Sequence, residues 1–366
     1  MVTSRIDIKE RLKKFQRWTS EEDGKAIFLT PGSNFFYLTG FDTDPMERLV
    51  AVVVAPEASI MIAPLMLEDQ IKKTSWPGEI FTWQDGEDPF RIVSEVLSSN
   101  KINKLAVERN LGYYIYELLK KLGIKKFNFV DERFTLERIR KTKSELDAIR
   151  TAVRRSEASY NDALNEVHRG ITEIELAGIL EYHFTRHSIQ KPAFGSIVAF
   201  GENSAIPHHL PSKRRLRSGD IILIDFGGKF GGYSSDTTRT CAFEGLSDKM
   251  RNVYAVVKEA QEKSLGNIVR GSKYSSIDNT ARKIISRAGY GEFFTHRVGH
   301  GLGVSVHEEP YLNSANEDTI QEGVVFTIEP GIYLKGSGGV RIEDTVLFDG
   351  KAAKPFNRLQ KELIIL

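Results

Sequence analysis

The sequence is poor in cysteine, in net charge and in long apolar runs. Its single cysteine, Cys241, excludes an internal disulfide and a thiolate metal site, and its apolar strand-like surroundings predict an inert buried thiol in a reducing compartment. The 51 basic and 49 acidic residues give no strong attraction to nucleic acid or to an anionic membrane. No apolar run is long enough to span a bilayer, and the segment from Met1 to Glu10 lacks the apolar part of a signal peptide, so we expect a cytoplasmic protein.

The length of 366 residues predicts two domains. Residues 1–133 alternate strand-like apolar runs with helical periodicity, which predicts an α/β domain. A charged stretch from Thr135 to Lys143 marks the boundary, so the second domain is expected to span residues 134–366. The expected strands of the first domain are Ala26–Leu29, Leu49–Val54, Ser59–Ala63, Lys104–Glu108 and Phe127–Val130, and its expected helices are Leu65–Lys73, Pro89–Leu97 and Tyr113–Leu122.

Four helices of the second domain are expected in two pairs. Their predicted N-caps are, in chain order, Ser144, Thr172, Ser247 and either Ser275 or Ser276. Glu175 stands three residues after the second of these caps, which is the spacing of a capping box. An offset of 103 residues separates the first cap from the third and the second from Ser275. The sequence therefore predicts a duplicated helix-helix-strand-hairpin unit, with helices over an antiparallel sheet in an α+β domain.

Two short stretches of the second domain repeat about a hundred residues further on. The run Gly219–Gly227 aligns with Gly323–Gly331 at an offset of 104, and Gly231–Thr238 aligns with Gly338–Thr345 at an offset of 107. The repeat pairs Asp225 with Glu329 and Asp236 with Glu343.

Each copy has the pattern of a hairpin with two acids facing each other across an antiparallel ladder. The turn of the first is expected near Phe230 and Gly231, and that of the second near Gly336. Opposed residues have Cβ atoms roughly 4.5 to 5.5 Å apart, where like charges repel. Because the acids end buried apolar runs, water screens them poorly, and two divalent cations would neutralise the four carboxylates. Solvated hairpin acids are the alternative, and the matched positions favour metal.

Three of the eight histidines lie in one window, His296, His300 and His307. His300 stands between two glycines, where a metal or a backbone can approach closely, so it is the predicted metal ligand. His296 and His307 could bind a substrate carbonyl or carry a proton. A lone histidine is more often structural, but three among glycines favour a site.

These residues resemble the pita-bread metallopeptidases, which include methionine aminopeptidase, aminopeptidase P and prolidase. The five-ligand order of that family appears here as Asp225, Asp236, His300, Glu329 and Glu343. The resemblance covers residues 144 to 366, and more loosely the first domain, where the segment from Asn34 to Phe41 is similar to the prolidase and creatinase N-terminal domain.

The resemblance assigns roles residue by residue. Asp225 would bind one metal, His300 and Glu329 the other, and Asp236 and Glu343 would bridge both. Further substrate-binding, proton-handling or supporting roles are implied for His208, His296, His307, Tyr333 and Arg341. His208 is chosen over His209 by family spacing, and His209 is expected to be exposed. Arg341 shares a strand face with Glu343, and a plain ion pair with a buried acid is its alternative role.

The resemblance implies hydrolysis of the bond before proline by a metal-bridging hydroxide, with Glu329 as general base and His307 or His208 stabilising the oxyanion. Mn is favoured by the oxygen-rich ligands, and Co, Fe or Zn are possible. The extra N-terminal domain argues against methionine aminopeptidase, and the chain length together with the compact form of that domain favours an Xaa-Pro dipeptidase. The resemblance also suggests a homodimer. Tyr311 stands where archaeal-type prolidases tend to have an arginine, so aminopeptidase P remains an alternative, as does a non-catalytic binding protein.

Overall fold

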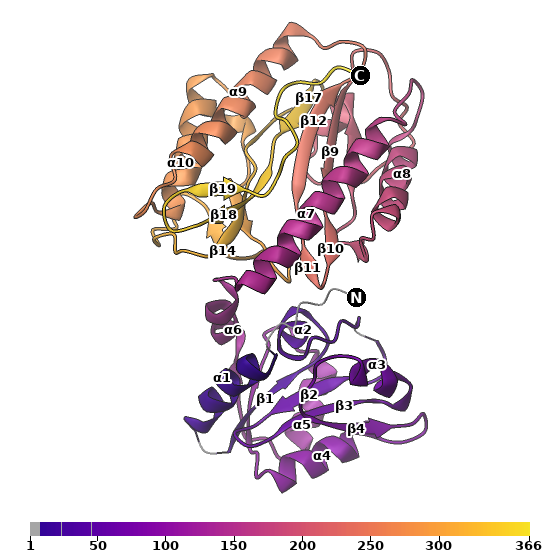
Figure 1. The fold of residues 1–366 in the computed structure, drawn as a ribbon, viewed down its shortest axis with the longest axis vertical. Helices are drawn as coiled ribbons and strands as arrows, with labels where there is room; N and C mark the ends of the chain where they lie inside the picture. The colour runs from indigo at the N-terminus through magenta and orange to yellow at the C-terminus, as the bar shows by residue number, and fades with distance from the viewer. Residues whose placement is uncertain (1–7, 23, 45) are drawn as a thin grey trace. The chain divides into compact units, whose positions relative to one another are not determined.

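The computed structural model describes residues 8–22, 24–44 and 46–366. The chain divides into two compact units, Met1–Glu137 and Arg138–Leu366 (Figure 1). The expectation that no targeting segment lies in Met1 to Glu10 rests largely on residues 1–7, which are outside the described residues. Among the helices that the structure describes, none has both the length and the apolar character needed to cross a membrane.

The N-terminal unit contains a mixed six-stranded sheet. Its strands are β1 (Lys25–Leu29), β2 (Ala51–Val54), β3 (Ser59–Pro64), β4 (Glu79–Trp83), β5 (Lys104–Val107) and β6 (Lys126–Phe129). Its helices are α1 (Ile8–Ser20), α2 (Ser33–Thr39), η1 (Leu65–Leu67), α3 (Glu68–Lys72), α4 (Pro89–Ser99), α5 (Tyr113–Lys121) and α6, which begins at Asp131 and runs to Arg138. The strand order is β4-β3-β2-β1-β5-β6, and apolar residues of the sheet pack with α4 and α5 in one core. The predicted α/β class is therefore confirmed.

The C-terminal unit has two halves, each built from a helix pair followed by strands. The first half contains α7 (Lys143–Leu164), α8 (Glu173–Arg186), β7 (Lys191–Pro192), β8 (Ile197–Phe200), η2 (Gly201–Ala205), β9 (Ile221–Phe226), β10 (Gly228–Phe230), β11 (Tyr233–Ser234) and β12 (Thr237–Ala242). The second contains α9 (Asp248–Gly266), α10 (Tyr274–Arg287), η3 (Gly291–Phe293), β13 (Gly299–Gly301), β14 (Glu308–Leu312), β15 (Val325–Ile328), β16 (Gly331–Leu334), β17 (Gly338–Arg341), β18 (Asp344–Phe348) and β19 (Ala353–Pro355).

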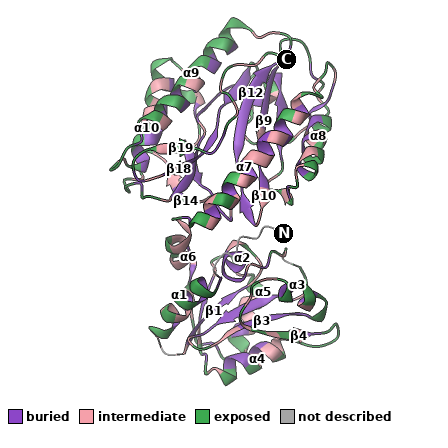
Figure 2. Cartoon of the chain, in the orientation of Figure 1, coloured by how far each residue is buried: buried purple, intermediate pink, exposed green. Residues whose placement is uncertain are grey.

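Each half has its own apolar core between helices and strands. In the first half, α7 and α8 pack against the sheet β12-β9-β8, with Tyr160 stacked on Phe226 at 4.9 Å between ring centroids. In the second half, α9 and α10 pack against strands β15 to β18. The strands between the helix pairs are buried, whereas the helices expose their outer faces (Figure 2). The predicted duplicated α+β architecture is therefore confirmed.

Two predicted helix starts are wrong. The N-cap of α7 is Thr142, not Ser144, because Thr142 forms a reciprocal capping box with Glu145. Helix α10 begins at Tyr274 after Lys273, and neither Ser275 nor Ser276 caps it. The backbone N–H groups of Tyr274 and Ser275 donate instead to carbonyls of a nearby loop, so no side-chain cap is needed. The predicted caps at Thr172 and Ser247 are confirmed.

The hairpin of the first repeat has a different register from the predicted one. Asp225 on β9 lies opposite Thr238 on β12, so it does not directly face Asp236. The reason is a two-residue turn at Gly231 and Gly232, both with positive φ, rather than a turn centred one residue earlier. The shift is two residues, which keeps Asp225 and Asp236 on one face of the sheet.

The hairpin of the second repeat has the predicted register. Ile328 pairs with Asp344 in the ladder of β15 and β18, and Gly331 pairs with Arg341 in the ladder of β16 and β17. The same register holds on both sides of the acids, so Glu329 and Glu343 occupy opposed positions.

Candidate metal centre

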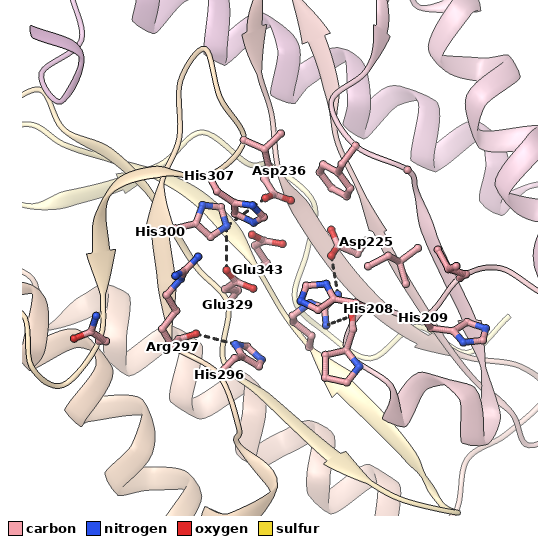
Figure 3. A pocket seen from close by; sticks show the side chains of 18 residues that line it. His208, His209, Asp225, Asp236, His296, Arg297, His300, His307, Glu329 and Glu343 are labelled. Atoms are coloured by element: carbon pink, nitrogen blue, oxygen red, sulfur yellow. Dashed lines mark hydrogen bonds and ion pairs between the residues drawn. The ribbon is translucent and has the colours of Figure 1, made fainter. Parts of the chain in front are cut away.

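The predicted acids and histidines converge on one pocket of the C-terminal unit, with a volume of about 690 Å³ (Figure 3). Two acids come from the first hairpin and two from the second. Three of the histidines come from β13 and the loops on either side of it, and His208 comes from the loop between η2 and β9. The predicted site residues that line the pocket are His208, Asp225, Asp236, His296, His300, His307, Glu329, Arg341 and Glu343. Tyr333 is the remaining predicted residue, and it contacts two of these from β16.

The possible ligand atoms form three overlapping groups. Within each group the atoms lie within 4.8 Å of one another. The groups are Asp225, Asp236 and Glu343; His300, Glu329 and Glu343; and Asp236, His300 and His307. Because Asp236, His300 and Glu343 each belong to two groups, the geometry suits adjacent cations that share ligands.

His300 presents a free nitrogen to these carboxylates. Its Nδ1 lies 3.1 Å from the carbonyl oxygen of Gly301, which can only accept, so Nδ1 carries the proton. Its Nε2 lies 3.2 Å from Glu329 Oε1 and 3.5 Å from Asp236 Oδ2. The glycine before His300 allows a neighbouring strand to come close, because a Cβ on Gly299 would lie 2.0 Å from the carbonyl oxygen of Thr327. A protonated Nδ1 leaves the Nε2 lone pair available to a metal ion.

Two buried carboxylate oxygens have no partner within the described part of the chain, Asp225 Oδ1 and Glu343 Oε1. Burial, reinforced by the neighbouring acids, raises the pKa of Glu343 and of Asp236 well above their ordinary values. Buried oxygens without hydrogen bonds are rare, because leaving one unsatisfied costs about 1–3 kcal/mol. The donor set of four carboxylates and one neutral imidazole therefore fits divalent cations.

Glu329 differs from the other acids. Burial alone would raise its pKa, but in the metal-free protein the hydrogen bond from a protonated His300 and the positive charge of that ring outweigh burial and hold the pKa at about 2. A cation bound at His300 Nε2 would take the place of that proton, so Glu329 is ionised in either state, as a metal ligand or a general base requires.

Arg341, Tyr333 and His296 form a directed chain of hydrogen bonds beside the acids. The Arg341 Nη1 donates to the Tyr333 hydroxyl at 2.8 Å, and that hydroxyl lies 2.9 Å from His296 Nε2. His296 Nδ1 faces the carbonyl oxygen of Arg297 at 2.7 Å, so it is the protonated nitrogen, and Nε2 accepts from the tyrosine. Burial lowers the pKa of His296, which agrees with a neutral ring. Arg341 Nη2 also pairs with Asp225 Oδ2 at 2.7 Å.

The remaining histidines of the pocket differ in what they contact. His208 and His209 both line the pocket, and the expectation that His209 is exposed is wrong. His209 Nε2 lies 2.8 Å from the fully buried Glu173 carboxylate, and its side chain is only 11% exposed. In Figure 3 it is directed away from the acids. His307 packs edge-on against His300, and desolvation together with that neighbour lowers its pKa to about 4, so its ring is neutral at pH 7.

Two threonines of the site were not predicted from the sequence. Thr238 Oγ1 donates to Glu343 Oε2 at 2.8 Å and accepts from Arg341 Nε at 3.0 Å. Thr327 Oγ1 donates to Glu329 Oε1 at 3.2 Å and accepts from the backbone N–H of His300 at 3.1 Å. Each lies two residues from a predicted acid, and this strand spacing is the signal that could have identified them.

Glu308, the residue after His307, belongs to a buried network of ion pairs that holds this segment of the chain in place. Glu308 bonds Arg138 at 2.5 Å and Lys141 at 2.9 Å, and Lys141 is 1% exposed. Burial would raise the pKa of Glu308, but the two cations outweigh burial and lower it below its ordinary value of 4.5.

We expect the substitution Glu308→Gln to destabilise the protein by about 3 kcal/mol at pH 7, because it leaves two cations without a buried counter-charge. A group whose pKa is lower in the folded state than in the unfolded state stabilises the folded protein at pH values above its unfolded-state pKa. This stabilisation is lost as the pH falls through the folded-state pKa. The difference between wild type and variant should therefore shrink below about pH 4.5. The midpoints of urea unfolding at several pH values measure this difference in stability. A difference that is constant from pH 7 to pH 3 would contradict the role of Glu308 as the buried counter-charge.

Known proteins match both units of the chain. Residues 147–349 match metallopeptidase family M24, and residues 11–142 match the creatinase/prolidase N-terminal domain. The Xaa-Pro dipeptidase of Pyrococcus furiosus is 34% identical over 98% of this chain and 100% of its own. Recombinant prolidase from Thermococcus sibiricus has a TM-score of 0.93 and 36% identity, covering 99% of this chain and 100% of its own. X-Pro aminopeptidase from Thermotoga maritima has a TM-score of 0.89 and 29% identity, covering 97% and 99%.

The family match covers more than half of the chain, and the solved structures match nearly all of it. The predicted pita-bread fold is therefore confirmed, as is the prediction of an enzyme. The chain belongs to metallopeptidase family M24 and is a peptidase that uses divalent metal ions.

Proposed function

We propose that this protein is an Xaa-Pro dipeptidase, which hydrolyses the bond before proline in dipeptides. The observation that carries the proposal is the pocket in which four carboxylates and His300 meet, with two carboxylate oxygens buried and unpaired in the described structure. The full-length similarity to the Xaa-Pro dipeptidase of Pyrococcus furiosus supports the substrate class.

Two cations would be held by the two hairpins and β13. Asp225 would bind one cation and His300 with Glu329 the other, while Asp236 and Glu343 would bind both. We propose Mn as the native metal, since oxygen donors dominate the set. Bound divalent ions supply Lewis acidity, which activates water and polarises a peptide carbonyl.

The side chains around the acids provide the other functions of a hydrolase. The neutral ring of His307, or His208 across the pocket, donates to the oxyanion that develops on the scissile carbonyl. His296 lies at the end of the Arg341 and Tyr333 chain, which fixes its protonation, and contacts the leaving proline. Glu329 is ionised and accepts the proton of the attacking water.

Aminopeptidase P activity on longer peptides remains the second candidate. The similarity to the X-Pro aminopeptidase from Thermotoga maritima favours it, as does Tyr311 at the position after the motif formed by His307, Glu308 and Pro310. Both candidate activities would use the same metal centre. They differ in whether the substrate ends at the proline or continues beyond it.

Kinetics on two substrates separate these candidates. We expect the Mn-loaded enzyme to hydrolyse an Xaa-Pro dipeptide with a kcat/KM at least about tenfold above that for a longer peptide with the same first two residues, because a factor of ten needs only about 1.4 kcal/mol of differential binding. Product analysis by chromatography measures both rates. Faster cleavage of the longer peptide would instead establish aminopeptidase P.

We also propose that the protein is a cytoplasmic homodimer whose N-terminal domain comprises residues 1–133. The buried single thiol of Cys241 suits a reducing compartment, and its burial raises its pKa to about 12. Sedimentation equilibrium tests the dimer, and a monomer mass at micromolar concentration would refute it.

A further inference from the structure

One wall of the metal pocket is a loop with neither helix nor strand. Residues 207–210 follow η2 and all line the pocket, and we call them the wall segment. The charge of His208 acts on His296 and His307, so its ring lies within electrostatic reach of both. His208 and Leu210 are nevertheless exposed, Leu210 by 83%. Because a loop with few buried apolar contacts opens easily, polar contacts must determine where His208 lies.

Glu173, the first residue of α8, binds the chain on both sides of the wall segment. Its Oε1 accepts from the backbone N–H of Phe200 at 2.8 Å and from Asn203 Nδ2 at 2.9 Å. Its Oε2 accepts from His209 Nε2 at 2.8 Å, and from the backbone N–H and the hydroxyl of Ser212 at 2.9 and 2.6 Å. A carboxylate can only accept, so His209 Nε2 carries a proton and donates it. One carboxylate therefore anchors the loop at four of its residues.

The Glu173 side chain is fully buried, with 0% exposure. Burial alone would raise its pKa, but the hydrogen bonds from Ser212, His209, Phe200 and Asn203 outweigh burial and lower the pKa below its ordinary value of 4.5. The N-terminus of α8 also favours a negative charge at this position. The five donors are therefore held by an ionised acceptor, and hydrogen bonds to a charged group are stronger than neutral ones.

The other side of His208 is attached to the metal centre. Arg341 Nη1 donates to the carbonyl oxygen of Pro207 at 3.4 Å, and Nη2 of the same guanidinium pairs with Asp225. His208 thus lies between one neighbour joined to a candidate metal ligand and another, His209, joined to a buried anion. A misplacement of about 1 Å can lower a rate by about 10²-fold, so these two anchors affect turnover.

We propose that Glu173 is a positioning residue, which acts through His209 to hold His208 where it donates to the oxyanion of the scissile carbonyl. This inference rests on the proposed Xaa-Pro dipeptidase function. Glu173 and His209 act on the reaction only through His208, which is the residue that touches the substrate.

A double-mutant cycle tests whether Glu173 acts through His208. We expect His208→Ala to lower kcat on an Xaa-Pro dipeptide about 100-fold, as the loss of one oxyanion donor does. Glu173→Gln should lower kcat about tenfold, with KM changed less than about threefold, because the amide points a donor at groups that donate. In the His208→Ala background, Glu173→Gln should lower kcat by less than about a further twofold.

Glu175→Gln supplies the matched control. Glu175 lies two residues further along the first turn of α8, is exposed and bonds only within its capping box, where glutamine also fits. This variant should behave as wild type. Metal analysis should find the same Mn content in all variants, because none replaces a candidate metal ligand.

Variants of His209 cover the case in which Glu173→Gln does not fold. His209→Gln keeps a donor that can reach the Glu173 carboxylate and should retain at least about half of kcat, whereas His209→Ala should lower kcat about tenfold. Such a rescue is not expected if His209 only fills space. Equal losses of kcat in the two variants would overturn the proposal.

Two further results would also overturn it. One is a tenfold effect of Glu173→Gln that persists unchanged in the His208→Ala background, and the other is full activity of His208→Ala. If wild type does not hydrolyse Xaa-Pro dipeptides, the proposed function fails, and amide hydrogen exchange tests the anchoring separately. Faster exchange of residues 200–212 in Glu173→Gln would support the anchoring, and unchanged exchange would refute it.

Discussion

Replacing Asp236 by asparagine is expected to lower kcat/KM on an Xaa-Pro dipeptide by about 10³-fold or more. Asp236 belongs to two of the three groups of possible ligands, so its loss affects both cation positions. The Lewis acidity of bound cations contributes several kcal/mol to transition-state stabilisation, and about 4 kcal/mol corresponds to the stated factor. Steady-state kinetics with Mn present measures the loss, and metal analysis of the dialysed protein should show fewer than two ions per chain.

The same variant should be more stable than wild type when both are free of metal. Burial and the charges of Glu343, Asp225 and Glu329 raise the pKa of Asp236, so the ionised group opposes folding. A raised folded-state pKa means that stability falls as pH rises from the unfolded value through the folded one. Asparagine removes that penalty, and the thermal midpoint of the metal-free variant should exceed that of wild type at pH 7.

Asp248, an exposed residue in the first turn of α9, supplies the control. Asp248→Asn should leave turnover and metal content unchanged and alter stability by less than about 1 kcal/mol. Undiminished turnover by Asp236→Asn, with two ions still bound, would eliminate the proposed metal centre.

The internal repeat predicted most of the metal centre because local chemistry determined its geometry. A short turn around Gly336 determines the register of the second hairpin, so the opposition of Glu329 and Glu343 could be predicted from symmetry alone. In the first hairpin, Gly231 and Gly232 both adopt positive φ and move the turn by one residue. The prediction that these acids lie on one face of the sheet still holds, because a shift of two residues in register leaves each side chain on the same face.

Contacts between segments that lie far apart in the sequence could not be predicted from the sequence alone. Arg297 and Tyr311 meet because β13 pairs with β14, and no local pattern specifies that pairing. His209 was misjudged for the same reason, since its partner Glu173 lies 36 residues earlier, at the start of α8. The helix pairs were predictable from periodicity, whereas the start of α10 depends on loop carbonyls that only tertiary structure supplies.

The largest effect on stability is expected at Arg239, a residue of β12 that the sequence did not single out. The residue is 3% exposed, and the five N–H groups of its side chain all have acceptors. Among them are the carbonyl oxygens of Thr238 at 3.0 Å and Glu343 at 2.5 Å, one from each hairpin, and the carboxylate of Asp344 at 2.8 Å. The hydrogen bonds of Arg239 therefore connect the backbone of the first hairpin with the backbone of the second, close to the metal-ligand acids.

Arg239→Lys should lower the free energy of unfolding by about 3–5 kcal/mol, because an ammonium offers three donors where five buried or partly buried acceptors are arranged around a planar fork. Denaturant midpoints measure the loss, and Arg251→Lys on the exposed face of α9 should change stability by less than about 0.5 kcal/mol. Since the Glu343 carbonyl loses its donor, metal affinity should also fall in the folded variant. A stability loss below about 1 kcal/mol would show that Arg239 contributes little to holding the two hairpins together, and that their alignment depends on the other contacts between them, such as the Arg341–Asp225 ion pair.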